Sequence, residues 1–363
     1  MRILGVIDSF TFGGAETQLA QMLAFLTVER SHQCLACSIL PQQDAEVTLD
    51  ARVPRIYLGK TSRRSLLRVT RDLVRLVRRF DPDVVYSRLP MANGLSRIAT
   101  WLTHRTIRHV AGIDTVPAMF TTSYTRTHPG SAVFRQLERH ATCIVCNSHG
   151  TARAVVDAGY PADRIRVVPN GVDVNRLSPL DQRPEPRRPQ LLCIASLRPE
   201  KGVERLILTL APLLRVHQVD LQIVGDGAER NRIDRTIAQL GVGHAVQLLG
   251  ARRDVLPVLH ASDLYVSAAS VEGFGIAVAE AAATGIPAVA FAVPGGLSEV
   301  IIDQVTGFLI PDGDAAPFQA AVKRLCEDVG LRTRMGVAAR AHVTESFALP
   351  RAAADLERYL RAE

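Results

Sequence analysis

The amino-acid sequence predicts an α/β protein built from two doubly wound parallel-sheet domains. Its 363 residues are too many for one ordinary hydrophobic core and suit two. Two series of short apolar runs alternate with helical patterns, as in parallel sheets whose strands are joined by helices. Between the series, residues 179–189 are rich in Pro and Arg and cannot continue a helix or a central strand. We therefore expect domains at residues 1–170 and 190–345, joined by a linker at residues 171–189.

The first series begins with a strand at residues 2–7 and a turn at residues 11–16 that leads into a helix. Gly13 and Gly14 in this turn allow the backbone to approach a ligand, and the helix start behind them can bind an anion. The G-x-G-x-x-G pattern of dinucleotide dehydrogenases is missing after this strand, which counts against NAD binding. Asn170 and Gly171, near the end of the series, suit a turn with positive φ. The other expected strands are residues 34–40, 84–87, 108–113, 143–147 and 165–168.

Residues 62–80 have a helical periodicity with two distinct faces. The apolar face consists of Leu66, Val69, Leu73, Leu76, Val77 and Phe80. The opposite face consists of Arg64, Arg68, Arg71, Arg75, Arg78 and Arg79. One interpretation is a surface helix with solvated arginines. The other is peripheral contact with anionic lipid headgroups or a lipid-linked phosphate through Arg64, Arg68, Arg71 and Arg75.

The second series has expected strands at residues 191–195, 220–224, 245–249, 264–267 and 288–291. Directly after the first of these strands stand Arg198 and Lys201, whose positive charges can neutralise a diphosphate. Arg198 is expected to share a face with position 196, because two positions along an extended segment restore the same side. Glycine-containing loops at residues 224–227, 250–253 and 294–299 end other strands on the same carboxyl edge, where open α/β sheets bind ligands.

The stretch at residues 271–287 follows a predicted strand and reads as a tight turn leading into an Ala-rich helix. The turn holds Gly273, Phe274 and Gly275, and the helix begins near Ile276. Such a helix start presents unpaired N–H groups to a phosphate. Glu272 in the turn and Glu280 in the helix are then best explained as acceptors of hydrogen bonds from hydroxyl groups. Together these features predict a nucleotide-sugar site.

Composition limits the remaining possibilities. The chain is 47% hydrophobic and 22% charged, and it has neither an apolar segment long enough to span a membrane nor a signal-peptide pattern, so we expect a cytoplasmic protein. Its net charge of +7 favours an anionic partner. The pairs Cys34/Cys37 and Cys143/Cys146 lie in apolar runs, where a strand would send them to opposite faces, so we expect buried thiols rather than a zinc site. Two Asp-x-Asp patterns, at residues 81–83 and 312–314, are interpreted as turns, so no metal is expected.

Residues 272–280 resemble the Glu-x7-Glu motif of the retaining glycosyltransferases of family four, which have the GT-B fold of two Rossmann-like domains facing a cleft. The resemblance implies that Glu272 lies against the donor hexose, that Glu280 binds the ribose, and that the backbone of residues 273–275 lies on sugar and phosphate. It also implies that Gly13 and Gly14 face the diphosphate, and that a last helix, at about residues 346–363, crosses back onto the first domain. No metal or cofactor is implied. The His that many members carry after the strand at residues 108–113 is absent; His109 is too early, and Asp114 stands near its place.

Three alternatives remain at this stage. A glycosidase with Glu272 and Glu280 as its acid/base pair is disfavoured, because eight residues along a helix separate them by about 12 Å. A sugar-nucleotide epimerase of the same fold would also use the predicted site. A basic nucleic-acid or membrane-binding module would explain the arginines but not the glutamates, Lys201 or the glycine loops. The favoured function is transfer of a hexose from a UDP- or GDP-sugar to a glycan or lipid-linked acceptor, with no nucleic-acid partner.

Overall fold

The computed structural model describes residues 1–11, 13–44, 46–62, 64–103, 106–116, 131–180, 188–216 and 218–361. The chain divides into two compact units. Unit 1 consists of Met1–Gly171 and Leu349–Glu363, and unit 2 of Val172–Ala348. The division therefore falls one residue beyond the expected end of the first domain. Residues 181–187 of the expected linker and Phe12 of the first glycine turn lie outside the described residues.

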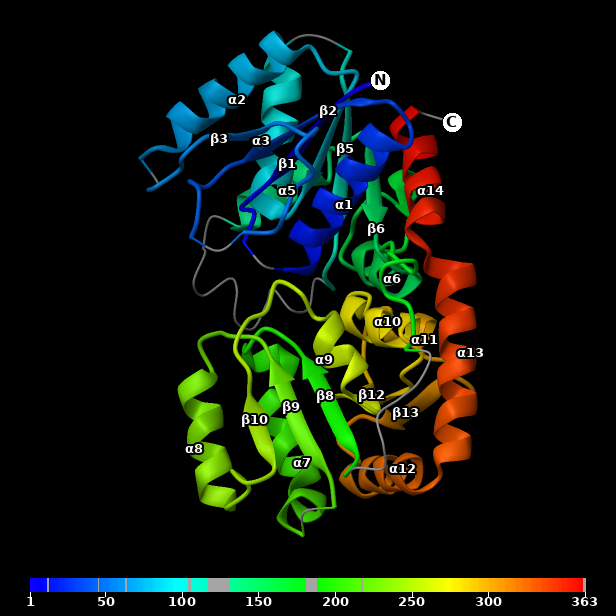
Figure 1. Ribbon diagram of the computed structural model, residues 1–363. Coiled ribbons are helices and arrows are strands. Elements are labelled where there is room, and N and C mark those ends of the chain that lie inside the picture. Colours follow the sequence, from blue (N-terminus) through cyan, green and yellow to red (C-terminus); the bar gives the residue numbers. More distant parts are fainter. Residues whose placement is uncertain are drawn as a thin grey trace. The chain divides into compact units, whose positions relative to one another are not determined.

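Unit 1 contains a seven-stranded sheet in the order β3-β2-β1-β4-β5-β6-β7, in which neighbouring strands pair in parallel (Figure 1). Strand β1 is buried along nearly its whole length, as expected for a parallel strand covered on both faces. The short edge strand β3 was not predicted from the sequence, because its three residues, Arg-Ile-Tyr, show no apolar run. The strands are β1 Arg2–Ile7, β2 Gln33–Ser38, β3 Arg55–Tyr57, β4 Val84–Arg88, β5 Arg108–Ile113, β6 Cys143–Cys146 and β7 Ile165–Val167.

Helices cover both faces of this sheet. Helices α1 and α14 share one apolar cluster with Ile3, Val84 and Val110, whereas α2 and α3 share another with Leu4 and Val85. Helix α14 belongs to unit 1 although it ends the chain, and His32 contacts its Glu357 at 2.8 Å. The helices are α1 Gly14–Val28, α2 Leu66–Phe80, α3 Pro90–Leu102, α5 Ser131–Glu138, α6 His149–Asp157 and α14 Leu349–Arg361, with a 3-10 turn at Ala162–Arg164.

Unit 2 contains a six-stranded parallel sheet in the order β10-β9-β8-β11-β12-β13, again with helices on both faces (Figure 1). Its strands are β8 Gln190–Ile194, β9 Asp220–Val224, β10 Val246–Leu248, β11 Leu264–Ser267, β12 Ala288–Ala292 and β13 Gly307–Pro311. Its helices are α7 Val203–Arg215, α8 Arg230–Leu240, α9 Leu256–His260, α10 Ile276–Ala283, α11 Leu297–Val300, α12 Ala315–Glu327 and α13 Val329–Phe347, with a 3-10 turn at Pro199–Lys201.

Each sheet has a point at which the order of strands reverses along the chain. In unit 1 the reversal lies between β1 and β4, and in unit 2 it lies between β8 and β11. Loops leave the two strands at such a point in opposite directions, which opens a crevice at the carboxyl ends of the strands. The strand order therefore indicates where each unit can hold a ligand.

The cysteine prediction is confirmed for both pairs. Cys34 and Cys143 pack in the cluster that includes α1 and α14, whereas Cys37 and Cys146 pack on the other side of the sheet. All four thiols are free and buried. Members of one pair therefore face away from each other and cannot share a metal ion.

The expected turn at Asn170 and Gly171 is wrong, because neither residue has positive φ. A glycine is needed at position 171 because the surrounding atoms leave no room for a side chain. A Cβ at Gly171 would lie 3.0 Å from the Leu349 Cα, and the Gly171 N–H and C=O both bond to the Gln18 side chain, at 2.9 and 2.8 Å. Asn170 is buried and contributes its side chain to a polar cluster described below.

Candidate functional site

In unit 2 the reversal point of the sheet carries a lysine–glutamate ion pair. The loop after β8 ends with Lys201, and the loop after β11 contains Glu272. The Lys201 Nζ donates to Glu272 Oε2 at 2.6 Å, and each side chain is about one-fifth exposed. Two of the residues predicted from the sequence to form the site are therefore in contact at the edge where α/β sheets bind ligands.

Close backbone contacts hold the loops around this pair together. Gly202 has a φ of +61°, and a Cβ there would lie 2.0 Å from the Ala268 carbonyl oxygen. The Ser270 N–H donates to the Glu200 carbonyl oxygen at 2.9 Å, which ties the β11 loop to the β8 loop. These contacts limit how far Lys201 and Glu272 can move apart.

A third loop, at residues 293–296, is bound to Glu272 through the backbone. The Glu272 N–H donates to the Pro294 carbonyl oxygen at 3.1 Å, and the Gly296 N–H donates to the Glu272 carbonyl oxygen at 3.0 Å. Gly295 has a φ of +119°, and a Cβ there would lie 1.8 Å from the same oxygen. Only glycine fits this position, because any side chain would be strained and would overlap backbone.

The Gly-Phe-Gly turn is anchored by its aromatic side chain. Phe274 is buried and packs edge-on against Phe347 with ring centroids 5.1 Å apart, while Gly275, with a φ of +93°, ends the turn. Helix α10 then starts at Ile276 without a side-chain cap and without an acidic residue in its first turn. The N–H groups of this first turn lack intrahelical acceptors and form a partial positive charge.

Glu280 lies in the middle of α10 and is half-buried. Burial raises its pKa from 4.5 to about 7, and the positive charge of Arg176 opposes this shift. Among the residues that the structure describes, its carboxylate has no hydrogen-bond or ion-pair partner. A carboxylate in this situation is stabilised by any ligand that donates hydroxyl hydrogen bonds to it.

The structure differs from two expectations about the site. Glu272 precedes α10 rather than lying on it, so its separation from Glu280 cannot be calculated from the rise of a helix. Arg198 itself has extended backbone, with φ −120° and ψ 154°, but its N–H bonds to the Ser196 carbonyl oxygen at 2.8 Å, so the chain turns tightly between positions 196 and 198. The exposed Arg198 guanidinium bonds instead to the Ser196 hydroxyl at 3.1 Å and to Glu200 at 3.2 Å.

The first glycine turn of unit 1 differs from those of unit 2. Gly13 has a φ of −169°, which is ordinary extended backbone, and it caps α1 without a side chain. A Cβ on Gly13 would lie 2.2 Å from a carboxylate oxygen of Glu16, in the first turn of the same helix, while Gly14 is exposed. The start of α1 therefore has an anionic side chain of the protein beside it.

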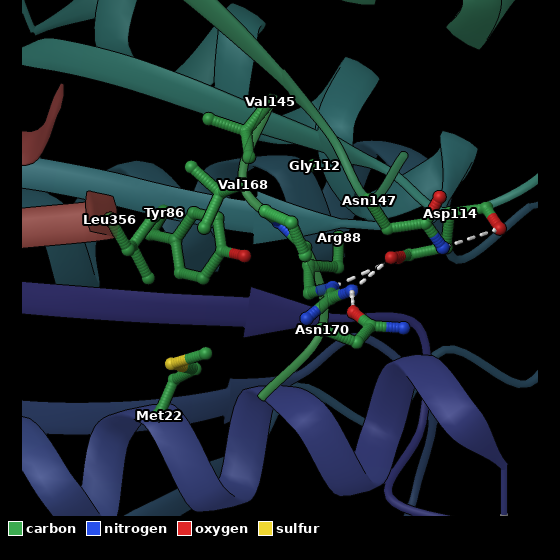
Figure 2. A pocket seen from close by; sticks show the side chains of 11 residues that line it. Met22, Tyr86, Arg88, Gly112, Asp114, Val145, Asn147, Val168, Asn170 and Leu356 are labelled. Carbon is green, nitrogen blue, oxygen red and sulfur yellow. Dashed lines mark hydrogen bonds and ion pairs between the residues drawn. The ribbon is translucent and has the colours of Figure 1, made fainter. Parts of the chain in front are cut away.

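A polar cluster at the carboxyl edge of unit 1 was largely missed from the sequence. Arg88, 4% exposed, forms a two-pronged ion pair with Asp114 and donates to the Asn170 side chain at 3.1 Å (Figure 2). The Asn147 Nδ2 donates to the Asp114 carbonyl oxygen at 3.0 Å. These residues line a cavity of about 10 Å³, room for about one water molecule. The available signal was that each of them ends or follows one of four parallel strands, β4, β5, β6 and β7.

His109 is fully buried, bonds to the Ser87 hydroxyl at 2.9 Å, and has its pKa lowered by burial to about 3. It therefore lies in the core of unit 1. The Asp-x-Asp residues lie at turns: Asp81 ends α2 with a φ of 48°, and Asp312 pairs with Arg205. Among the described residues, no group of three or more His, Cys, Asp or Glu side chains could hold a metal ion.

The two faces of α2 are as predicted. Val69, Leu73 and Val77 are buried. The six arginines at positions 64, 68, 71, 75, 78 and 79 are exposed, and Asp72 pairs with Arg68, Arg71 and Arg75. Within the described part of the chain, no helix combines the length and the apolar character needed to cross a bilayer.

Comparison with known proteins identifies the class. The model of glycosyl transferases group 1 matches residues 180–342, and that of Glycosyltransferase Family 4 matches residues 12–176. Among solved structures, HepE from Anabaena in complex with UDP-glucose superposes with a TM-score of 0.84 at 23% identity, covering all of both chains. Sucrose-phosphate synthase from Thermosynechococcus elongatus superposes with a TM-score of 0.83 at 18% identity, covering 100% of this chain and 99% of that one. These likenesses show a GT-B fold.

Two curated relatives agree with this class. The lipopolysaccharide core biosynthesis glycosyltransferase LpsE of Rhizobium meliloti is 32% identical over 57% of this chain and 59% of its own length. The GDP-mannose-dependent α-(1-6)-phosphatidylinositol monomannoside mannosyltransferase of Mycolicibacterium smegmatis is 33% identical over 57% of this chain and 58% of its own length. The chain thus covers less than two thirds of each relative. With the two family models, these matches show that the chain belongs to the group 1 glycosyltransferases of family four.

Proposed function

We propose that this protein is a retaining glycosyltransferase that moves a hexose from a UDP- or GDP-sugar to an acceptor hydroxyl without a metal ion. The observation that carries the proposal is the Lys201–Glu272 pair at the reversal point of the unit 2 sheet, beside an uncapped helix start. Glu280 in that helix is half-buried and has no partner among the described residues, so it adds a second acceptor for ligand hydroxyls. The names of the relatives support the donor class, since one is GDP-mannose-dependent and one structural neighbour was solved with UDP-glucose.

Each residue has a role that its chemistry suits. The Lys201 ammonium has three donors, so it can keep one hydrogen bond to Glu272 and give another to the donor diphosphate. The N–H groups at Ile276, with the backbone of Gly273, Phe274 and Gly275, complete the phosphate and sugar contacts. Glu272 orients the hexose, and Glu280 accepts hydrogen bonds from the ribose. Arg198 supplies a second positive charge after its side chain leaves Glu200.

The reaction breaks the bond between the hexose C1 and the diphosphate oxygen, and forms a bond from C1 to the acceptor oxygen on the same face. The departing phosphate oxygen takes the acceptor proton, so no side-chain base is required. Negative charge grows on the diphosphate as it leaves, and Lys201 and the start of α10 stabilise that charge more in the transition state than before it.

Titration with UDP and GDP, followed by product analysis with nucleotide sugars, tests this function. A glycosyltransferase binds at least one nucleotide and releases it only as sugar reaches an acceptor. An epimerase would alter the sugar without any acceptor, and a basic binding module would show no competition by nucleotide sugars. Either result would refute the proposal.

Glu272→Gln is the variant that tests the site. We expect nucleotide affinity to fall no more than about tenfold, through the lost pairing with Lys201, and transfer to fall on the order of 100-fold, because Glu272 is assigned to the hexose. Glu327→Gln is the matched control, since Glu327 is an exposed residue at the end of α12 in the same unit, pairs with Lys323 and has no assigned role. Full transfer activity of the Glu272 variant in a steady-state assay would show that the role given to this residue is wrong.

We also propose that the acceptor is a glycan or lipid-linked molecule and that the protein contacts anionic membrane through α2. The exposed arginines of α2 favour this interpretation, and exposed apolar side chains lie near them. Leu67 in α2 is 84% exposed and Trp101 in α3 is 64% exposed, and Arg78 donates to the Leu102 carbonyl oxygen at 3.2 Å, which joins the ends of the two helices. Tryptophan beside arginine is typical of membrane interfaces.

Sedimentation with vesicles that contain anionic lipid tests this contact. Replacing Arg68, Arg71 and Arg75 with Gln should weaken binding at low salt on the order of 100-fold, at about 1 kcal/mol for each arginine. The control replaces Arg230, Arg232 and Arg235 of α8 with Gln, which removes the same charge from unit 2. Equal loss in both triple variants would mean that only net charge matters, and no binding by the unaltered protein would exclude the contact.

A further inference from the structure

Strands β8 and β11, which flank the proposed donor site, are paired over only part of their length. The paired positions are Leu264 with Leu191 and Tyr265 with Leu192. The same register would continue to Ser267 opposite Ile194, but the backbones are not paired there, although both strands extend that far. The two strands therefore diverge toward their carboxyl ends, directly below the loops that carry Lys201 and Glu272.

The Tyr265 hydroxyl bonds to the backbone groups of Ile194 that have no partner on β11. The Ile194 N–H donates to the Tyr265 hydroxyl at 3.3 Å, and the hydroxyl donates to the Ile194 carbonyl oxygen at 3.0 Å. In a parallel sheet both of these Ile194 groups would bond to the neighbouring strand. Tyr265 is 3% exposed and its ring packs in the apolar cluster with Leu192, and this packing of the ring holds the hydroxyl in position.

Two short loops connect strands β8 and β11 to the ion pair. Strand β8 leads through residues 195–200 to Lys201, and β11 leads through residues 268–271 to Glu272. The two loops are locked together at Gly202 against Ala268 and at Ser270 against Glu200. A change in strand spacing at Ile194 therefore has few ways to relax before it reaches the Lys201 and Glu272 side chains.

We propose that Tyr265 is a positioning residue, whose hydroxyl holds β8 and β11 apart and so sets the geometry of the Lys201–Glu272 pair. The alternative is a tyrosine that only fills the core, in which case its hydroxyl affects stability but not the pair. The inference rests on the proposed function only where nucleotide binding is concerned, because the ion pair exists without a ligand.

The first experiment measures coupling without substrate. Lys201→Met and Glu272→Gln are made singly and together, both in the unaltered protein and in the Tyr265→Phe background. Urea unfolding of each variant then gives the coupling free energy between the Lys201 and Glu272 side chains in each background. Tyr265→Phe keeps the ring and removes only the hydroxyl. We expect the coupling to fall by at least half in the Tyr265→Phe background. Equal coupling in the two backgrounds, including none in either, would overturn the proposal.

The second experiment measures nucleotide binding by titration with UDP and GDP. Tyr265→Phe should weaken binding about threefold to tenfold, as expected when one buried hydrogen bond is lost. Ser262→Ala is the control, because it removes a buried hydroxyl bond of 2.6 Å, to the Val258 carbonyl oxygen, just before the other end of β11. Equal weakening in both variants, or none in either, would contradict a positioning role. If neither nucleotide binds the unaltered protein, the proposed function fails, and the coupling experiment still decides the role of Tyr265.

Discussion

Charged and amide side chains stand where the parallel strands end in both units, and the two sets differ in how they are paired. In unit 1, Arg88 and Asn170 are buried, the Asp114 side chain is 9% exposed, and Arg88 bonds to both of the other side chains. In unit 2, Lys201 and Glu272 are paired but partly exposed, and Glu280 has no partner among the described residues. The same doubly wound topology thus carries a closed polar cluster in one unit and an open one in the other.

This difference indicates which edge can take a charged ligand at low cost. A buried ion pair must be broken before its groups can bind anything else, and breaking it is expensive. A partly exposed lysine with spare donors gains hydrogen bonds when a ligand arrives, and so does a carboxylate that has no partner among the described residues. The comparison therefore favours unit 2 as the donor-binding unit and gives Arg88 and Asp114 a structural role in unit 1.

The largest expected effect is at Arg88. Arg88→Met leaves the Asp114 carboxylate buried without its cation, so unit 1 should lose about 3–5 kcal/mol of unfolding free energy. Urea unfolding measures this loss. Arg166→Met in the same unit is the control, because Arg166 is exposed and its guanidinium bonds to the carbonyl oxygens of Asp163 and Ile165. Similar losses in both variants would mean that the unit 1 cluster is not the closed network described above.

The second prediction compares a glycine turn of unit 2 with the glycine turn of unit 1. Gly295→Ala combines positive φ with a collision against the Glu272 carbonyl oxygen, so it should destabilise unit 2 by about 2–4 kcal/mol and weaken UDP or GDP binding. Gly13→Ala meets only the end of the Glu16 side chain at ordinary φ, so it should cost under about 1 kcal/mol. Thermal unfolding and nucleotide titration of both variants provide the measurement. Comparable effects in the two would show that the glycine turns are equivalent.

The smallest expected effect is a pH dependence at Glu280. Its pKa is raised from 4.5 to about 7, so the folded protein holds this proton while the unfolded chain releases it. The stability contributed by the proton is complete below pH 4.5 and is lost as the pH rises to about 7. Glu280→Gln should therefore match the unaltered protein near pH 4.5 and exceed its stability at pH 8, by on the order of 2 kcal/mol after allowing for partial exposure.

Unfolding at the two pH values measures this effect, and nucleotide titration should show weaker binding by the Glu280 variant. Asp8 and Glu138 of unit 1 also have their pKa raised by burial to about 7. Only the difference between Glu280→Gln and the unaltered protein therefore isolates Glu280. A difference in stability that is the same at both pH values would mean that Glu280 is not held neutral in the folded protein.

Much of the fold could be predicted because its signals are local. Apolar runs and helical periodicity located β1, β2, β4, β5 and β8 to within about two residues, and the arginine face of α2 followed from spacing alone. Lys201, Glu272 and the Gly-Phe-Gly turn could be grouped because residues just after parallel strands share one edge of the sheet. The short β3 could not be found, because it is a strand only through pairing with β2.

The sequence by itself determined the alternation of strands and helices, the two faces of α2, the buried cysteines and the residue types available at the strand ends, because each depends on neighbours in the chain. Only the tertiary structure decided which of those residues pair. It placed Arg88 on Asp114 and Asn170, left Glu280 without a partner among the described residues, turned Arg198 toward Glu200, and put the Tyr265 hydroxyl on the Ile194 backbone. The physical reason is that these pairings join segments 26 to 82 residues apart, or depend on one tight turn, and hydrophobic periodicity carries no information about either.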